Sequence, residues 1–141
     1  MKKNLLLLFG LLFFIQISSA QKTLYLYGGE NHNIFLGCLN CSDVESNSIW
    51  NDVGEYGSNV SSTSIWNDVG EYGSDVSSYS PWNDVASYPP VVVDKDGGFY
   101  GYLTINEAKL KRADFHLALL LYKYHDLIKD DVSKWYTKIF N

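Results

Sequence analysis

The sequence predicts an α+β fold, made of a small antiparallel sheet from two hairpins, a stacked 16-residue repeat segment between them and a C-terminal helical segment. Three observations support this. Strand–loop–strand patterns occupy residues 21–41 and 89–104. A 16-residue repeat fills residues 42–88. Apolar residues recur at helical spacing within residues 105–141. We therefore expect residues 21–141 to form a single domain.

Residues 1–20 have the pattern of a signal peptide. Two lysines precede an apolar run from Leu5 to Ile15, and the small residues Ser18-Ser19-Ala20 follow as a cleavage site. The run is shorter than the roughly 18 apolar residues that span a membrane. We expect the mature chain to begin at Gln21, to be secreted or periplasmic, and not to insert into a membrane.

The charge of the mature chain limits its partners. Without Lys2 and Lys3, 9 basic residues face 16 acidic ones, a net charge of −7. Residues 42–88 hold eight acidic residues and no lysine, arginine or histidine. This balance excludes binding to nucleic acid through phosphate attraction and disfavours anionic membranes. The expected partner is a protein or a glycan, whose identity the sequence does not give.

Each predicted hairpin has strand-forming residues on both sides of a loop rich in Gly, Asn or Asp. The expected strands are Thr23–Tyr27 with Ile34–Leu39, and Val91–Val93 with Phe99–Leu103. Both second strands contain Phe-x-Gly-x-Leu, which indicates one motif used twice. Because an isolated hairpin is marginally stable in water, we expect the two hairpins to pair in one sheet.

The segment between the hairpins repeats Ser-Ile-Trp-Asn-Asp-Val-Gly-Glu-Tyr-Gly-Ser at residues 48–58 and 64–74, with a diverged copy at 80–88. Tryptophans at 50, 66 and 82 fix the period. Ser80 before Pro81 resembles a helix start, and Ile, Trp, Val and Tyr have helical spacing. We expect each unit to form one short helical turn and an extended segment, stacked with Trp and Val inward.

The C-terminal part is predicted to be helical. Thr104 and Glu107 have the spacing of a capping box, which favours a helix start there. An amphipathic stripe follows at Leu110, Ala113, Leu117, Leu121, Tyr124 and Ile128. A second short helix is expected to start at Asp130 or Asp131.

The repeat motif and its flanking hairpins resemble a class of uncharacterised secreted bacterial proteins. These carry tandem Tyr-Gly-Ser, Tyr-Ser-Ser and Trp-Asn repeats between glycine-bearing hairpins. The motifs that carry the resemblance are Ser-Ile-Trp-Asn-Asp-Val-Gly-Glu-Tyr-Gly-Ser, Val-Ser-Ser-Tyr-Ser-Pro-Trp-Asn and the later Val-Val-Asp-x-x-Gly-x-Phe-Tyr-Gly, within residues 24–104. The resemblance implies no activity.

The cysteines Cys38 and Cys41 are the motif with the most obvious chemistry. In an exported chain we expect a structural disulfide. A thioredoxin-like pair needs its first cysteine at a helix start, whereas Cys38 falls in a strand pattern. A metal site would need two further ligands, and the sequence holds no second cysteine pair. No cofactor or metal is therefore expected.

The repeated aromatic and acidic residues each allow two interpretations. Trp50, Trp66 and Trp82, with the tyrosines Tyr56, Tyr72 and Tyr88, form either a repeated core or a glycan-stacking face, and the regular spacing favours a core. Asp52, Asp68 and Asp84 either cap turns or form a calcium-binding ladder, and turn capping is favoured. The loop at residues 94–98 is expected to be a plain hairpin turn rather than a calcium loop.

No catalytic motif is recognisable, and His116 and His125 are separated by about half a rotation on a helix. The sequence therefore favours a non-enzymatic repeat protein, a structural or protein-interaction module of the cell envelope or extracellular space. The alternative is a glycan- or calcium-binding module that uses the aromatic or acidic face of the repeats.

Overall fold

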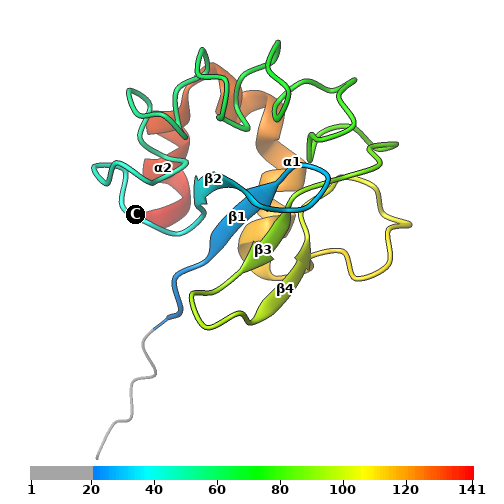
Figure 1. Ribbon diagram of the computed structural model, residues 1–141. Coiled ribbons are helices and arrows are strands. Elements are labelled where there is room, and N and C mark those ends of the chain that lie inside the picture. The colour runs from blue at the N-terminus through cyan, green and yellow to red at the C-terminus, as the bar shows by residue number, and fades with distance from the viewer. Residues whose placement is uncertain (1–20) are drawn as a thin grey trace, which may run out of the picture.

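The computed structural model describes residues 21–141, so the expected signal peptide lies outside the described residues. Two antiparallel hairpins form a four-stranded sheet of order β2-β1-β3-β4 (Figure 1). The hairpins meet where β1 pairs with β3, which confirms the predicted pairing into one sheet. The strands are β1 (Tyr25–Gly28), β2 (Ile34–Cys38), β3 (Val91–Val93) and β4 (Phe99–Tyr102).

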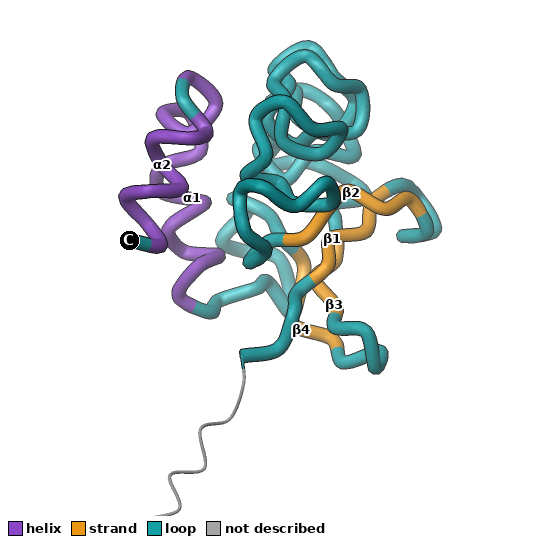
Figure 2. Tube along the Cα trace, turned by 90° about the vertical axis from the view of Figure 1, so that its left-hand side faces the viewer, coloured by secondary structure: helices purple, strands orange, loops and turns teal. Residues whose placement is uncertain are grey.

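Two helices lie on one side of the sheet (Figure 2). Helix α1 spans His116–Asp130 and helix α2 spans Val132–Phe140. The Asp131 carboxylate caps α2 by accepting a hydrogen bond of 3.0 Å from the Lys134 amide. The sheet and the helices confirm an α+β fold, and the predicted start of the second helix is confirmed.

The helix predicted from the capping box at Thr104 is wrong, because α1 begins only at His116. The Thr104 hydroxyl accepts from the Asn106 amide, and the Asn106 side chain accepts from the Ala108 amide. These local bonds hold the backbone in turns and compete with a helix. Leu110, expected on the buried stripe, is 85% exposed.

This turn segment repeats the backbone pattern that follows the first hairpin, 64 residues earlier. The Ile49 amide donates to the Cys38 carbonyl, and the Ala113 amide donates in the same way to the Tyr102 carbonyl. The amides of Cys38 and Tyr102 bond to the carbonyls of Asn47 and Lys111 in turn. Both second strands contain a register irregularity next to a glycine at positive φ, Gly37 and Gly101. The motif Phe-x-Gly-x-Leu therefore marks a structural element that is used twice.

The repeat segment is a coil of consecutive β-turns without helix, so the predicted helical turns are wrong. In the middle unit, a series of backbone hydrogen bonds closes one turn after another. Each amide donates to the carbonyl of the preceding member of the series, which consists of residues 58, 61, 64, 67, 70 and 74. A Ser or Asn starts most of these turns, and its side chain binds the amide two residues on. The five steps span 16 residues, which explains the period.

The coil curves over the helices and the edge of the sheet, with its outer turns projecting in a row (Figure 1). The core joins all three parts: Leu26, Leu36 and Val92 of the sheet, the repeat tryptophans, and Leu121 and Ile128 of α1. Within residues 21–141, no helix has the length and apolar character needed to cross a membrane.

Candidate functional site

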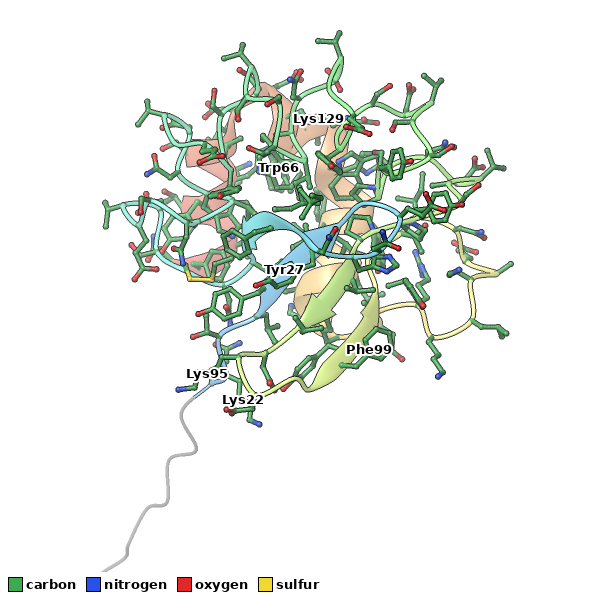
Figure 3. All side chains as sticks on the ribbon, viewed as in Figure 1. Lys22, Tyr27, Trp66, Lys95, Phe99 and Lys129 are labelled. Carbon is green, nitrogen blue, oxygen red and sulfur yellow. A yellow bond between two sulfur atoms is a disulfide. The ribbon has the colours of Figure 1, made fainter. Side chains whose placement is uncertain are left out.

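The repeat tryptophans Trp50, Trp66 and Trp82 lie in the core, each at most 2% exposed. Their indole N–H groups reach back one unit and donate to the carbonyls of Leu39, Ile49 and Ile65, at 2.6–2.7 Å. A buried indole needs such an acceptor, so each unit depends on the one before it. Figure 3 places Trp66 inside the arc of turns.

The three indoles form a column that the helices close. The centroids of neighbouring rings are 5.8 and 5.6 Å apart. His125 of α1 stacks on Trp82 at 4.6 Å, and Tyr136 and Phe140 of α2 contact Trp50. The indole faces are therefore covered by protein, which leaves the repeat tryptophans no face for a sugar ring.

A buried cation fixes α1 to the coil. The Lys129 ammonium donates to the Asp68 carboxylate at 2.6 Å and to the Gly73 carbonyl at 2.9 Å. The Lys129 side chain is 5% exposed, whereas that of Asp68 is 73% exposed. Asp68 was considered above as a turn cap or as part of a calcium ladder. In the structure its carboxylate instead forms an ion pair with Lys129 of α1.

The valines of the repeat face outward, so the prediction that Val packs inward with Trp is wrong. Six valines occupy equivalent places in the coil and are 79–93% exposed. Each is the third residue of a β-turn that we call an outer turn, and each follows an Asp or Asn. We call these residues the valine series: Val44, Val53, Val60, Val69, Val76 and Val85.

The backbone holds the valine series in a defined arrangement. In each outer turn the amide of the fourth residue bonds to the carbonyl of the first, at 2.9–3.3 Å. The hydroxyl or amide oxygen of that first residue also accepts from the valine amide, at 3.1–3.4 Å. Both bonds restrict the backbone of the outer turn, so the valine side chains project from ordered positions.

The acidic residues beside the valine series are also exposed on the outer turns. Asp52, Asp68 and Asp84 occupy the second position of their turns, and within residues 21–141 none of their carboxylates accepts from a turn amide. The prediction that these aspartates cap the turns is wrong, because the asparagine one residue earlier does so. Across residues 21–141 there is no group of three or more His, Cys, Asp or Glu side chains arranged to hold a metal ion. The geometry does not assemble the calcium ladder considered from the sequence.

The repeat tyrosines cover the first hairpin. Tyr72 is buried against Gly28, where an added Cβ would lie 3.3 Å from its ring. Tyr56 contacts Phe35 edge-on at 4.9 Å, and the Tyr88 hydroxyl donates to Glu30 at 3.2 Å. Burial raises the pKa of the Tyr72 phenol, with the nearby Glu71 carboxylate adding to the effect. These rings serve packing between coil and sheet.

Cys38 and Cys41 form a disulfide with Cα atoms 5.6 Å apart. Cys38 is buried at the end of β2, whereas Cys41 lies at the start of the coil. The bond thus joins sheet and coil at the point where the chain passes from one to the other. No helix begins at Cys38, so the geometry lacks the helix start that lowers a redox cysteine's pKa.

The loop between β3 and β4 is closed by Asp94. Its Oδ1 accepts from the amides of Asp96 and Gly98, and its Oδ2 accepts from the Tyr100 hydroxyl at 2.8 Å. The Gly98 amide and the Tyr100 hydroxyl lower the pKa of Asp94 to about 2. Both oxygens are occupied by internal donors, which fits a hairpin turn rather than a calcium ligand.

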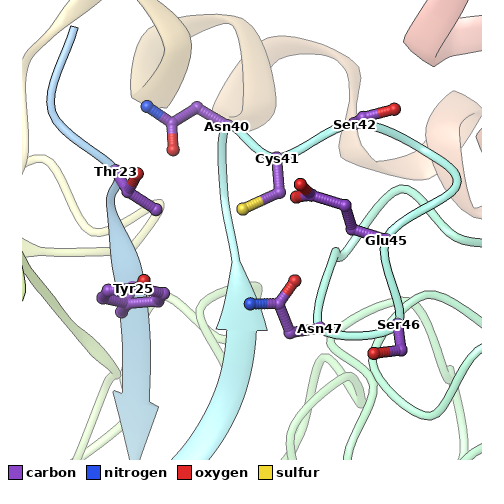
Figure 4. Close-up of a pocket in the computed structure, with 8 residues that line it drawn as sticks. All are labelled: Thr23, Tyr25, Asn40, Cys41, Ser42, Glu45, Ser46 and Asn47. Atoms are coloured by element: carbon purple, nitrogen blue, oxygen red, sulfur yellow. The ribbon is translucent and has the colours of Figure 1, made fainter.

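A polar pocket that the sequence pattern does not predict lies beside the disulfide, and Figure 4 shows its lining residues. It lies between β1, the end of β2 and the first outer turn, and it includes Tyr25, Glu45 and Asn47. Alternation in Leu24–Tyr27 would have placed both tyrosines on the outer face of the sheet. The approach of residues 45–47 to this face depends on the turns, which the sequence pattern did not predict.

Comparisons with protein-family models, with curated proteins and with solved structures gave no match for this chain.

Proposed function

We propose that this chain is an exported, non-catalytic interaction module that binds a protein partner through the valine series. The observation that carries the proposal is the exposure of six apolar side chains at equivalent positions of an ordered coil. Turn positions favour Gly, Asn, Asp and Ser, and nothing in the outer turns packs on these valines. The outer turns project in a row (Figure 1), so the valines repeat along one side of the coil. Apolar side chains gathered on one face of a soluble protein mark interaction sites.

The fixed backbone favours binding. Association costs free energy when loops and side chains must be ordered at the interface. The outer turns are already restricted by two hydrogen bonds each, and valine has one restricted side-chain torsion. Full burial of one such side chain contributes about 1.5–3 kcal/mol before the costs of association.

Charge indicates the chemistry of the partner. An Asp or Asn precedes every valine of the series, and residues 42–88 contain eight acids without a Lys, Arg or His. The complementary surface is a protein face with apolar recesses and a basic rim. A second copy of this chain is a poor occupant, because two acidic coils would repel each other.

The disulfide supports an exported location for this chain. Such bonds form and persist in oxidising spaces, including the periplasm and the extracellular medium. The Cys38–Cys41 bond and the signal-like pattern of residues 1–20 both support export. The covered indoles favour a protein-binding role over glycan binding by the repeat tryptophans.

The proposal is tested by affinity capture with matched variants. Residues 21–141 and a Val53→Ser/Val69→Ser/Val85→Ser variant are immobilised and exposed to the extracellular and periplasmic proteins of the producing cells. The control, Leu110→Ser/Leu119→Ser/Leu127→Ser, removes three exposed apolar residues outside the coil. We expect one protein to be retained by the wild type and the leucine variant and lost from the valine variant.

The retained protein is then purified and titrated by calorimetry. The valine variant should bind it at least tenfold more weakly than the wild type, equivalent to about 1.4 kcal/mol or more. Equal binding by the valine variant, or the absence of any retained protein, would contradict the proposal.

A further inference from the structure

The pocket beside the disulfide has a volume of about 590 Å³ and is open to solvent. Figure 4 shows the residues that line it. Its size lies within the range of roughly 300–1,000 Å³ that small-molecule sites occupy. Its walls come from β1, from the Cys41 side of the disulfide and from the loop at residues 45–47. Polar atoms dominate the lining, so an apolar ligand would not match it.

Five polar side chains that line the pocket have no hydrogen-bond partner within residues 21–141. Those of Thr23, Tyr25, Glu45, Ser46 and Asn47 form no hydrogen bond with any other residue of the 21–141 segment. In contrast, the Asn40 side chain is bonded to the backbone before β1, because it accepts from the Leu24 amide and donates to the Lys22 carbonyl. Hydroxyl, amide and carboxylate groups that point into the pocket are therefore available to a ligand.

The frame around these side chains is fixed. The Asn47 carbonyl accepts a bond of 2.7 Å from the Cys38 amide, and the Ser48 hydroxyl donates to the Cys41 carbonyl. The disulfide closes residues 38–41 into a covalent loop, to which these two bonds attach Asn47 and Ser48. Because these bonds exist without a ligand, little free energy is spent on ordering the site.

We propose that this pocket binds a neutral carbohydrate. The Tyr25 ring offers an apolar face and a polar edge, which suits the C–H face and hydroxyls of a sugar ring. The Asn47 amide both donates and accepts, and the Glu45 carboxylate accepts, so vicinal hydroxyls find complementary partners. The Glu45 charge and the acidic coil disfavour uronic acids, sulfated sugars and other anions.

This inference goes beyond the proposed function, because the pocket contains none of the valine series. Binding at the pocket and binding at the valine series can therefore be tested independently. A variant of the outer valines should retain sugar binding, and a variant of the pocket should retain the protein partner.

The experiment is calorimetric titration of residues 21–141 with four trisaccharides: cellotriose, maltotriose, N-acetylchitotriose and trigalacturonic acid. We expect at least one neutral trisaccharide to bind with a Kd of about 1 mM or tighter, and the acidic one not to bind. Tyr25→Ala and Asn47→Ala should each weaken binding at least tenfold. Phe99→Ala is the matched control, because it removes an exposed aromatic ring of the same sheet outside the pocket.

Thermal unfolding of each variant separates loss of the site from loss of the fold. The Asn47 side chain makes no bond within residues 21–141, so Asn47→Ala should remain folded and should decide the test even if Tyr25→Ala does not fold. Failure of all neutral trisaccharides to bind the wild type would overturn the proposal. Unchanged affinity in folded Asn47→Ala would also overturn it.

Discussion

The indole Nε1 of Trp66 donates a hydrogen bond of 2.7 Å to the carbonyl of Ile49, 17 residues earlier in the preceding unit. Trp82 makes the same bond to Ile65. The first unit is tied in this way to the sheet, through Trp50 and the Leu39 carbonyl. Tryptophan thus couples successive units and anchors the coil to the first hairpin, so the coil and the sheet stabilise each other.

This coupling predicts that Trp66→Ala is strongly destabilising. Truncating a buried aromatic residue costs on the order of 3–5 kcal/mol. Trp66→Phe should cost less, because it keeps a ring in the column but leaves the buried Ile49 carbonyl without its donor, a loss of about 1–3 kcal/mol. Denaturant unfolding measures both values. A Trp66→Ala protein with an unchanged midpoint would show that the column does not support the fold.

The outer valines are predicted to contribute nothing measurable to stability. Val69→Ser should change the free energy of unfolding by less than about 0.5 kcal/mol, as is usual for exposed positions. Val92→Ser, in the core of β3, is the matched control and should be strongly destabilising. A large loss of stability in Val69→Ser would mean that the valine is retained for folding and not for binding.

The disulfide is predicted to stabilise the fold modestly. Its cysteines are three residues apart, and the loop-entropy relation gives about 2 kcal/mol for so short a loop. Cys38→Ser/Cys41→Ser should therefore unfold at a lower temperature but still fold. Thiol titration of the unfolded, unreduced wild type should find none of these thiols. Two reactive thiols in air-exposed protein would contradict the disulfide and the inferred compartment.

The stability of the fold should depend on the ionisation of Asp94. Its pKa is lowered from 3.8 to about 2 in the folded chain, chiefly by the Gly98 amide and the Tyr100 hydroxyl. A lowered pKa stabilises the fold above the unfolded value, and this contribution is lost as the pH falls between about 4 and 2.

Asp94→Asn should therefore flatten the decrease in unfolding midpoint across that window. Asp75→Asn, which removes an acidic residue from an outer turn, serves as the control for loss of one negative charge. Identical acid profiles for wild type and Asp94→Asn would contradict the assignment.

Much of the sheet followed from sequence patterns. Alternating strand residues around Gly-rich loops predicted both hairpins, and the shared Phe-x-Gly-x-Leu motif corresponds to paired irregularities at Gly37 and Gly101. Helix α2 followed from its Asp cap. In these elements a local signal and the tertiary environment favour the same conformation.

The coil could not be derived in this way. Ile49, Trp50 and Val53 have the spacing of a helix, yet each Ser or Asn binds the backbone two residues ahead and produces a turn instead. Helical spacing then placed Val53 on the Trp50 side, whereas the turn directs it to solvent. Because a valine packed inward needs no partner, helical spacing does not predict the exposed valine series.

The most direct test of the valine series is site-specific photo-crosslinking in the producing cells. A photoreactive benzoylphenylalanine replaces Val69 in one strain and Leu110, which is 85% exposed outside the coil, in another. We expect one discrete crosslinked protein from position 69 and no crosslink to that protein from position 110. Absence of an adduct at position 69, or the same adducts at both positions, would contradict the proposal that the outer valines form the binding surface.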